Sequence, residues 1–428
     1  MSKPDIAYVR TQMLPEAEPP ATEKGVIKWL RENLFDGPWN TALTLVSLFV
    51  LAQLLIAAVP WFWNSVWNTS SLAECRAVLD GTRGACFSVL TERWHQLLFG
   101  FTYPSSEYWR PTLAFVLLIV AAAPVLFSKL PRPLLIFTGV YPFLAFWLIW
   151  GGTILTPLFA LLGFVAAYFI FVRVEGRSFA LAVLAGLVGM VTVWWLGGRI
   201  VASGLDAATL LPVRSRDLGG FMVNMMLGTV CVSLSLPIGI LLALGRQSSL
   251  PIIKWICVVY IEFIRGVPLI TLLFVANVVL AYFLPPGTNF DLILRVIIMI
   301  TMFSSAYIAE VIRGGLAALP RGQYEAGDSL GLDYAQSMRL IILPQALKIS
   351  IPGIVNVAVG LFKDTTLVSI ISMYDLVGII RNTIPSVTAW QGIYWETWTF
   401  AIVVFFVICY GISQYSQWLE RQLQRDHR

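Results

Sequence analysis

Long apolar runs recur along the whole chain, and each is close in length to a membrane-spanning helix. One helical crossing of a bilayer needs about 20 predominantly apolar residues. Of the 428 residues, 58% are hydrophobic and 12% are charged, whereas a soluble domain carries about 25% charged residues. We therefore predict an all-α integral membrane protein with about ten transmembrane helices. The predicted spans are residues 40–60, 111–128, 134–150, 153–172, 179–197, 219–244, 258–284, 291–312, 347–371 and 396–418.

The positions of lysine and arginine predict how these spans are oriented. Positive charge next to a span resists translocation and stays in the cytoplasm. If the N-terminus is cytoplasmic, most basic residues outside the spans fall in cytoplasmic segments. The exceptions on the outer side are Arg76, Arg83, Arg93, Arg110, Arg199, Arg214, Arg216 and Arg381. Half of these lie in one long outer loop, residues 61–110, where the rule is weaker. Both termini are therefore predicted to be cytoplasmic.

The first 38 residues are polar and rich in proline, so we predict no secretory signal peptide. The first span then serves as the targeting signal. Within this tail, apolar residues recur at helical spacing among basic ones, which suits a helix lying in the inner membrane interface. A short cytosolic lead-in to the first span is the alternative. The apolar residues concerned are Val26, Ile27, Trp29, Leu30 and Leu34.

Two cysteines, Cys75 and Cys86, fall in the outer loop 61–110. The predicted topology exposes them to an oxidising compartment, where disulfides form and persist. We expect a disulfide between them, with two free thiols as the alternative. No metal site is predicted, because the only histidines, His95 and His427, are too few to build a cluster with them.

A polar, glycine-containing segment, residues 318–346, separates the eighth and ninth spans on the predicted cytoplasmic side. Residues 322–330 can form a short helix with Glu325 near its start, where an acidic side chain suits the helix dipole. Gly331 can adopt the left-handed conformation that ends a helix. Asp333 is placed to cap a second helix. The segment is therefore predicted to be a rigid helix, hinge and helix, and we call it the coupling loop.

Six residues of the coupling loop match the spacing of a signature known as the EAA motif. They are Glu325, Ala326, Gly331, Ile341, Leu343 and Pro344. The motif is found in permease subunits of ATP-binding-cassette (ABC) importers, where it docks an ATPase, and the segment resembles that family. An ordinary cytoplasmic connection between helices is the alternative, but it would need no fixed offset between these residues. The third position of the triplet is commonly Ala, whereas this chain has Gly327.

A wider resemblance covers about half of the chain, from residue 218 to residue 419. Within it the sequence is similar to the amino-acid branch of importer permeases. The matching segments are EFIRGVPLI (262–270), SSAYIAEVIRGGL (304–316), LPRGQYEAG (319–327) and FKDTTLVSII (362–371). The first five spans resemble those of the longer, M-type permease subunit of the broad-specificity L-amino-acid importers (Aap/Bzt group) of Gram-negative bacteria.

This resemblance implies a domain organisation. The last five spans would form an ABC type I importer permease core. The expected parts are a cytoplasmic tail (1–38), a five-span extension with its outer loop (39–197), a periplasmic connection (198–218), the permease core (219–418) and a cytoplasmic end (419–428).

The resemblance also implies the partners and the location of the protein. Such a subunit pairs with a second, related permease, two cytoplasmic ABC ATPase subunits and a periplasmic amino-acid-binding protein, in the bacterial inner membrane. The chain has no Gly-Lys dipeptide and hence no phosphate-binding loop, so ATP is expected on the partners and no cofactor on this chain. The protein is therefore expected to be a pore subunit and not an enzyme, with no nucleic-acid partner.

Charged residues at membrane depth need a partner or a wet cavity, because burying an isolated charge is costly. Glu262 and Arg265 are three residues apart, a spacing that places them on one helix face. Glu310 and Arg313 repeat this arrangement. We predict structural pairing or loop anchoring for both couples, with direct substrate contact as the alternative. Arg295, near the outer end of its span, is expected to extend toward the interface.

Lys363 and Asp364 are adjacent, so their side chains point about 100° apart on a helix and cannot face each other. At least one of them must find its partner on another helix or in the substrate pathway. An amino acid carries both an ammonium and a carboxylate group, so this couple is a candidate for transient substrate contact. An interhelical or subunit-interface ion pair is the alternative.

The leading functional hypothesis is a permease subunit of an ATP-driven importer of L-amino acids, in which a partner ATPase moves the coupling loop. The alternative is a secondary transporter or channel driven by an ion gradient through Glu262, Lys363 and Asp364. The absence of an internal repeat argues against that alternative. A membrane enzyme has little support, because the chain contains neither an HExxH nor a GxSxG motif.

Overall fold

The structure of the protein is a computed structural model that describes residues 25–127, 129–204, 208–279 and 290–425. Most of these residues are helical, and one pair of two-residue strands is present. The predicted all-α architecture is therefore confirmed for the described part of the chain. Most of the predicted cytoplasmic tail and the end of the seventh predicted span, residues 280–284, lie outside it.

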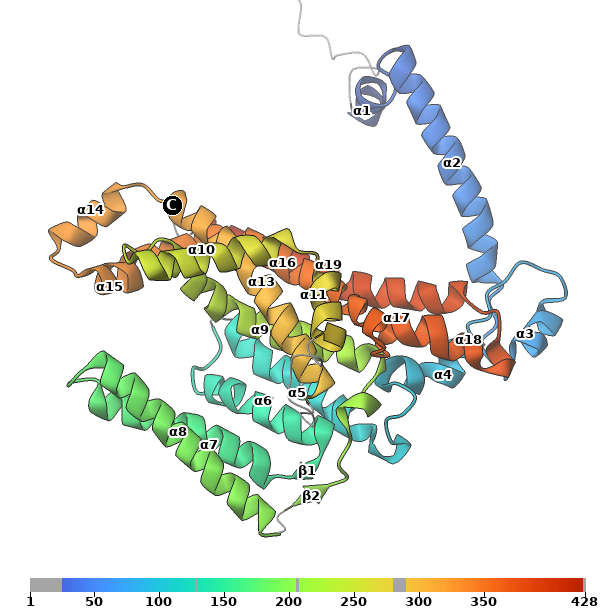
Figure 1. Ribbon diagram of the computed structural model, residues 1–428. Helices are drawn as coiled ribbons and strands as arrows, with labels where there is room; N and C mark the ends of the chain where they lie inside the picture. Colours follow the sequence, from blue (N-terminus) through green and yellow to red (C-terminus); the bar gives the residue numbers. More distant parts are fainter. Residues whose placement is uncertain (1–24, 128, 205–207, 280–289, 426–428) are drawn as a thin grey trace, which may run out of the picture. The chain divides into compact units, whose positions relative to one another are not determined.

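The elements follow the chain as coloured in Figure 1. In the text, η denotes a short 3-10 or π-helical segment. The first half contains α1 (Gly25–Asn33), α2 (Gly37–Trp63), α3 (Leu72–Leu79), α4 (Ser88–Phe99), η2 (Ser105–Glu107), α5 (Trp109–Leu126), α6 (Leu134–Trp150), β1 (Gly152–Thr153), α7 (Leu155–Val174), α8 (Phe179–Ala202), β2 (Thr209–Leu210) and η3 (Ser215–Asp217). The second half contains α9 (Gly220–Arg246), α10 (Pro251–Gly266), α11 (Leu269–Phe274), η4 (Val275–Val279), α13 (Leu292–Ala317), α14 (Gly322–Ser329), α15 (Tyr334–Ser337), η5 (Met338–Ile342), α16 (Leu343–Asp364), η6 (Thr365–Ile371), α17 (Leu376–Gly378), η7 (Ile379–Thr383), α18 (Ile384–Ser386), η8 (Thr388–Trp390) and α19 (Trp395–Arg425).

The chain forms two compact units. The first consists of Met1–Val66 and Cys75–Cys86, and the second of Trp67–Glu74 and Phe87–Arg428. The boundaries of these units differ from those of the predicted domains. The predicted domain boundaries follow membrane topology rather than compactness, and they remain predictions.

In the first unit, α1 forms where apolar residues recur at helical spacing, but its place at a membrane interface stays a prediction. The long helix α2 has 27 residues, none of them buried, and contains an 18-residue stretch with a mean hydropathy of 2.5. Pro38 lies in its first turn, where the missing N–H has no helical partner to lose. A helix so apolar and so exposed suits a lipid environment.

Eight helical segments are long and apolar enough to cross a membrane. They are Gly37–Trp63, Ser105–Leu126, Leu155–Val174, Phe179–Ala202, Gly220–Arg246, Leu292–Ala317, Tyr334–Ile371 and Trp395–Leu423. A bent pair of helices raises the number to nine among the described residues, against the predicted ten or so. The remaining predicted span is α6, whose 17 residues rise only about 26 Å, less than the hydrocarbon thickness of about 30 Å.

The predicted span 258–284 is not one continuous helix. Instead, α10 ends at Gly266 and a second helical segment runs from Leu269 to Val279, at an angle of 100° to the first. The cause is Pro268, because a residue before proline is disfavoured in the helical conformation. Val267 is accordingly extended, with φ −109° and ψ 131°.

Four helices of the second unit, α9, α10, α13 and α16, pack together as the centre of the molecule's C-terminal half (Figure 1). Their contact surfaces combine buried aliphatic residues, such as Leu227 and Ile300, with glycines. A Cβ added at Gly228 would come within 2.7 Å of the Phe362 ring, and one at Gly239 within 2.6 Å of Ile308. Small residues therefore allow these helices to approach closely, as is common in membranes.

The N-terminal helices of the second unit form two antiparallel pairs, α5 with α6 and α7 with α8 (Figure 1). Arg110, at the start of α5, is completely buried. Its Nε donates to Leu148 O at 2.7 Å and its Nη1 to Leu211 O at 2.9 Å. Glu107 neutralises the charge, with its Oε2 3.5 Å from Arg110 Nη1. Through these hydrogen bonds, Arg110 connects α5 and α6 to the end of strand β2, which precedes the permease core.

The outer loop also contacts the core directly. Helix α4 packs against α9, and Gly100 lies so close to Gly219 that a Cβ on Gly100 would be 2.6 Å from its Cα. Trp390, fully buried near the C-terminal end, donates from Nε1 to Glu92 Oε2 at 3.1 Å. The end of the outer loop is therefore part of the same packed unit as the core.

Candidate functional site

The coupling loop has the helix, hinge and helix form that its sequence predicts. Helix α14 ends before Gly331, whose φ of +69° is in the left-handed region. Asp333 Oδ1 accepts a hydrogen bond from Gln336 N at 2.7 Å, and Gln336 Oε1 accepts one from Asp333 N at 3.2 Å. This reciprocal capping box fixes the start of α15.

Two further contacts hold α14 against the helices that follow. Gly327 is buried, and a Cβ there would overlap Ser337 Oγ, so the glycine lets α14 lie directly on α15. This close approach is the structural reason for the departure from alanine at the third position of the triplet. Gln345 Nε2 also donates to Gln323 Oε1 at 2.8 Å, which ties α14 to the first turn of α16.

The six motif residues divide into an exposed and a half-buried group. Glu325, Ala326, Gly331 and Pro344 are exposed, whereas Ile341 and Leu343 pack against a buried cluster that includes Ile342 and Ile312. Large apolar side chains beside the motif remain uncovered, with 71% of Leu330, 66% of Tyr334 and 64% of Leu340 exposed. The loop therefore combines a fixed backbone with an apolar outer surface.

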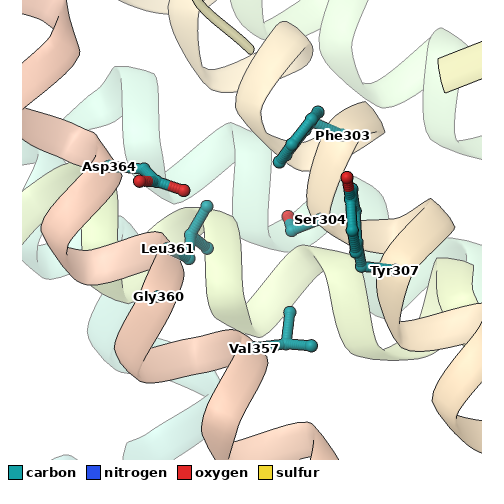
Figure 2. Close-up of a pocket in the computed structure, with 7 residues that line it drawn as sticks. All are labelled: Phe303, Ser304, Tyr307, Val357, Gly360, Leu361 and Asp364. Carbon is teal, nitrogen blue, oxygen red and sulfur yellow. The ribbon is translucent and has the colours of Figure 1, made fainter. Parts of the chain in front are cut away.

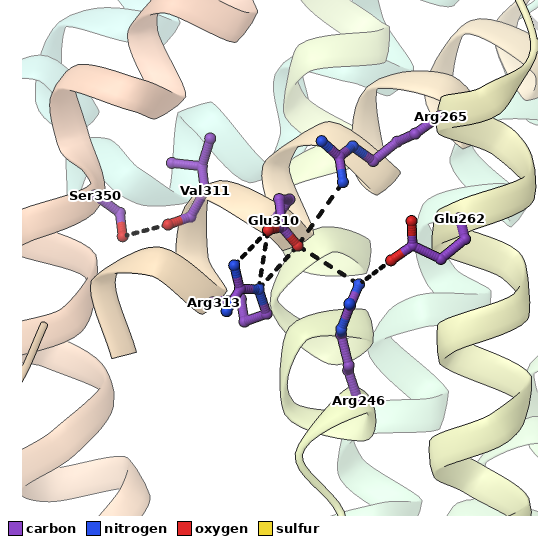
Figure 3. A network of polar contacts seen from close by, with 7 residues as sticks. All are labelled: Arg246, Glu262, Arg265, Glu310, Val311, Arg313 and Ser350. Atoms are coloured by element: carbon purple, nitrogen blue, oxygen red, sulfur yellow. Dashed lines mark hydrogen bonds and ion pairs between the residues drawn. The ribbon is translucent and has the colours of Figure 1, made fainter. Parts of the chain in front are cut away.

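A charge network lies where the ends of α9 and α10 meet the last turns of α13 (Figure 3). It consists of Arg246, Glu262, Arg265, Glu310 and Arg313, three cations with two anions. Glu310 is its centre, with Oε2 3.5 Å from Arg246 Nη1 and 3.9 Å from Arg265 Nη1. The predicted pairing of Glu310 with Arg313 is present, because Arg313 Nε donates to both carboxylate oxygens at 2.9 Å.

Glu262 and Arg265 both form ion pairs, but with residues on other helices and not with each other, although their spacing allows it. Glu262 Oε1 instead lies 2.8 Å from Arg246 Nη1, while the Arg265 guanidinium turns toward α13 and sits 5.5 Å from the centre of the Tyr307 ring. The sequence does not predict a role for Arg246, because this residue falls outside the predicted span 219–244. Its place in the last turn of an apolar helix is the one sequence signal that could have identified it.

A cavity of about 260 Å³ lies between α13 and α16, and we call it the Asp364 cavity (Figure 2). Phe303, Ser304 and Tyr307 line it from α13, opposite Leu361 and Asp364 on α16. Among the described residues Asp364 forms no ion pair. Its neighbour Lys363 is exposed, so the two side chains diverge, as the helical geometry predicts.

The Asp364 cavity and the charge network share helix α13. Tyr307 lines the cavity and also contacts Arg265. Ser350 on α16 donates from Oγ to Val311 O at 3.3 Å beside Glu310, which joins the same two helices (Figure 3). A movement of α13 relative to the helices around it would therefore alter both the cavity and the network.

A buried hydrogen-bond cluster lies just beyond the C-terminal end of α16, and no sequence prediction included it. Asn224 Nδ2 donates to Thr365 Oγ1 and to Asp375 Oδ2, both at 3.0 Å, while its Oδ1 accepts from Leu376 N at 3.1 Å. Asp375 Oδ1 caps α17 by accepting from Gly378 N at 2.9 Å. Burial raises the pKa of the Asp375 carboxyl to about 6. A lone asparagine in an apolar helix is the signal that could have pointed to this cluster.

The structure joins Cys75 to Cys86 by a disulfide, with the two Cα atoms 6.0 Å apart. It closes a short stretch of the outer loop that includes Gly81 and Gly84. Near it, Asn64 Nδ2 donates to Arg83 O at 3.1 Å. These contacts give this stretch of the loop a defined shape.

Comparison with known proteins identifies the family. Residues 235–425 match the family described as binding-protein-dependent transport system inner membrane component. The chain is 51% identical to the glutamate/glutamine/aspartate/asparagine transport system permease protein BztC of Rhodobacter capsulatus, over 99% of this chain and 100% of that protein. It is 36% identical to the inner membrane amino-acid ABC transporter permease protein YhdY of Escherichia coli, over 92% of each.

Among solved structures, an amino acid ABC transporter crystallised with histidines is 33% identical over 47% of this chain and 92% of that chain, with a TM-score of 0.43. The match to BztC and YhdY extends through the first five spans as well as the core. The resemblance drawn from the sequence motifs is confirmed. The chain therefore belongs to the family of multi-pass inner-membrane permease subunits of amino-acid ABC importers, in which a separate subunit hydrolyses ATP.

Proposed function

We propose that this permease imports polar amino acids, namely glutamate, glutamine, aspartate and asparagine, from the periplasm to the cytoplasm. The observation that carries this substrate class is the 51% identity, over the full length of both chains, to a permease named for these four amino acids. A pore of this kind needs little selectivity of its own if a periplasmic binding protein selects the substrate.

The coupling loop is the part that receives mechanical work from the ATPase. An interface core is usually apolar and framed by polar residues. Leu330, Tyr334 and Leu340 supply exposed apolar contacts, and Glu325 lies beside them. Because Gly331, the capping box and the contact of Gly327 with Ser337 fix the backbone, the loop moves as one body.

The remaining partners and the orientation follow from this role. The coupling loop faces the cytoplasm, as do both termini, and the disulfide-containing loop faces the periplasm. Two ATPase subunits, a second related permease and a periplasmic amino-acid-binding protein complete the transporter. The extension 39–197 and the core 219–418 keep the boundaries that the topology predicts.

The Asp364 cavity is the part of the pathway where the substrate ammonium group is held. Asp364 is the carboxylate in this cavity, and it forms no ion pair with another described residue. A carboxylate near membrane depth favours a cation beside it. Because Tyr307 links the cavity to the charge network, movement of the cytoplasmic ends of α10 and α13 reaches the bound amino acid.

Uptake into proteoliposomes tests the proposal. The transporter is purified with the subunits that copurify, and entry of labelled glutamate and glutamine is followed with ATP inside and the binding protein outside. We expect uptake that needs ATP and persists after proton and sodium gradients are collapsed. Excess unlabelled aspartate or asparagine should compete. Uptake that stops with the gradients, or that proceeds without an ATPase subunit, would refute the ATP-driven mechanism.

A further inference from the structure

A second cavity, of about 360 Å³, lies at the opposite end of α13 from the charge network, and we call it the outer cavity. It lies among η3, η4, the first turn of α13 and the residues that follow η6. Arg216, Asn277, Arg295, Ser372 and Tyr374 are among the residues that line it. In the proposed orientation this end of α13 faces the periplasm, where the substrate arrives.

The charged side chains that line the outer cavity are both arginines. No carboxylate is among the described lining residues, and neither arginine forms an ion pair with another described residue. The nearby carboxylate of Asp291 is occupied, because its Oδ1 accepts from Ile293 N at 2.9 Å and from Leu294 N at 3.2 Å as the cap of α13. The outer cavity therefore holds positive charge that the described chain does not neutralise.

Arg295 has N–H groups for which the described residues provide no acceptor. Its Nη1 donates to Asn277 O at 3.1 Å, which holds the guanidinium in place instead of letting it extend freely toward an interface as predicted. Its Nε is buried and has no hydrogen-bond partner among the described residues. A buried donor without a partner is costly, and a guanidinium offers five N–H groups in a planar fork that matches a carboxylate.

The outer cavity and the Asp364 cavity are separate places along one helix. Arg295 and Ser304, which lines the Asp364 cavity, are nine residues apart on α13, which corresponds to about 14 Å along the helix axis. The outer cavity presents cations and the inner one an anion. An amino acid carries both complementary groups, so two such places in succession suit its passage.

We propose that the outer cavity binds the carboxylate of the incoming amino acid through Arg295 and Arg216 before the substrate reaches the Asp364 cavity. The inference rests on the proposed import of amino acids and adds to it a binding site for their anionic group. Arg295 is the positioned, partly buried ligand, and Arg216 is the exposed arginine at the mouth of the cavity.

The test uses the complete transporter in proteoliposomes with saturating loaded binding protein. The variants are Arg295→Gln, Arg295→Lys and Arg216→Gln, and the matched control is Arg214→Gln, an exposed arginine next to η3 that does not line the cavity. Uptake of labelled glutamate and of labelled glutamine is measured, together with the ATPase rate that the loaded binding protein stimulates. We expect Arg295→Gln to slow uptake about tenfold, as loss of a charged hydrogen bond predicts.

Arg216→Gln should slow uptake less, Arg295→Lys should retain part of it, and Arg214→Gln should leave it unchanged. Equal losses for glutamate and glutamine assign the site to the α-carboxylate, and a loss for glutamate alone assigns it to the side-chain carboxylate. Arg216 has no described contact to lose on substitution, so the Arg216→Gln variant should fold normally. It therefore tests the site even if Arg295→Gln fails to fold. Normal uptake by both the Arg216→Gln and the Arg295→Gln variants overturns the site while leaving the proposed function intact. Failure of the unmodified transporter to import either amino acid overturns both.

Discussion

At the scale of single residues, glycine has opposite effects at neighbouring positions of the coupling loop. Gly327 is packed against Ser337, so a side chain there would separate two helices. A Cβ added at Gly322, at the start of the same helix, would meet no atom within 4 Å. Intrinsic helix propensity ranks alanine above glycine at both sites by about 1 kcal/mol. Packing therefore decides how an alanine substitution changes stability. From the structure we expect opposite effects at Gly327 and at Gly322.

We predict that Gly327→Ala lowers the melting temperature of the purified permease, because the new Cβ overlaps Ser337 Oγ. Gly322→Ala is the matched control and should leave the melting temperature unchanged or raise it slightly, since propensity alone acts there. Thermal unfolding in detergent measures both. Equal stabilisation by the two substitutions would show that α14 does not lie on Ser337.

The charge network gives a second prediction at this scale. A double-mutant cycle between Arg246→Gln and Glu262→Gln should give a coupling energy of about 0.2–1 kcal/mol, because the pair is partly exposed and screened by solvent. The same cycle between Arg265→Gln and Glu262→Gln should give a value near zero, since these side chains do not meet. The free energy of unfolding in a denaturant titration supplies the energies. A larger coupling energy for Arg265 with Glu262 than for Arg246 with Glu262 would show that Glu262 pairs within α10.

At the scale of secondary structure, much of the core could be predicted from the sequence. Apolar length identified the helices, and the sequence Val267-Pro268 carried enough information to predict the bend between α10 and α11, although length alone suggested one span. The partner of Glu262 could not be predicted in this way. Spacing along one helix places Arg265 near it, but Arg246 reaches it through space from another helix. The hinge at Gly331 and the cap at Asp333 were predictable, because both depend only on local backbone conformation.

A further prediction concerns the coupling loop and its role in linking ATP hydrolysis to import. Gly331→Val forces a β-branched residue into a left-handed conformation, and Glu325→Lys reverses an exposed charge at the proposed ATPase contact. We expect both variants to insert normally into the membrane but to hydrolyse ATP without importing substrate. Uptake and ATPase rate are compared in the same proteoliposomes, with Gly322→Ala as the control. Normal uptake by both variants would remove the role assigned to the loop.

The buried cluster around Asn224 gives a prediction about pH. The pKa of Asp375 rises from its ordinary value of 3.8 to about 6 in the folded protein, so the folded state binds the proton more tightly than the unfolded state. This contribution to stability is present below about pH 4 and is lost as the pH rises through about 6. The change amounts to about 3 kcal/mol at most, at about 1.4 kcal/mol per pKa unit.

The variant Asp375→Asn removes the titrating group and should remove this pH-dependent part of the stability. The free energy of unfolding is measured for both proteins between pH 4.5 and pH 7.5, and the difference between them is plotted. We expect the variant to become more stable relative to the unmodified protein as the pH rises. A difference that stays constant across this range would show that Asp375 keeps its ordinary pKa.

At the scale of the whole molecule, the outer loop and the coupling loop are predicted to face opposite sides of the membrane. Lysine and arginine positions predict this arrangement, and two local structures are consistent with it. A disulfide joins Cys75 to Cys86, and disulfides persist outside the cytoplasm. The coupling loop, in contrast, presents exposed apolar side chains such as Leu330, which suit the proposed ATPase contact on the inner side.

Labelling with a membrane-impermeant maleimide tests the arrangement of the whole chain. In a variant with Cys257→Ser, Cys409→Ser and Leu330→Cys, we expect Cys75 and Cys86 to be labelled from the periplasmic side, and only after reduction. The cysteine at position 330, where the natural side chain is 71% exposed, should be labelled only in inverted vesicles. The same variant with Leu330 retained is the control for background at buried Cys231. Labelling of position 330 from the periplasm would invert the topology, and an ATPase could then not reach the loop.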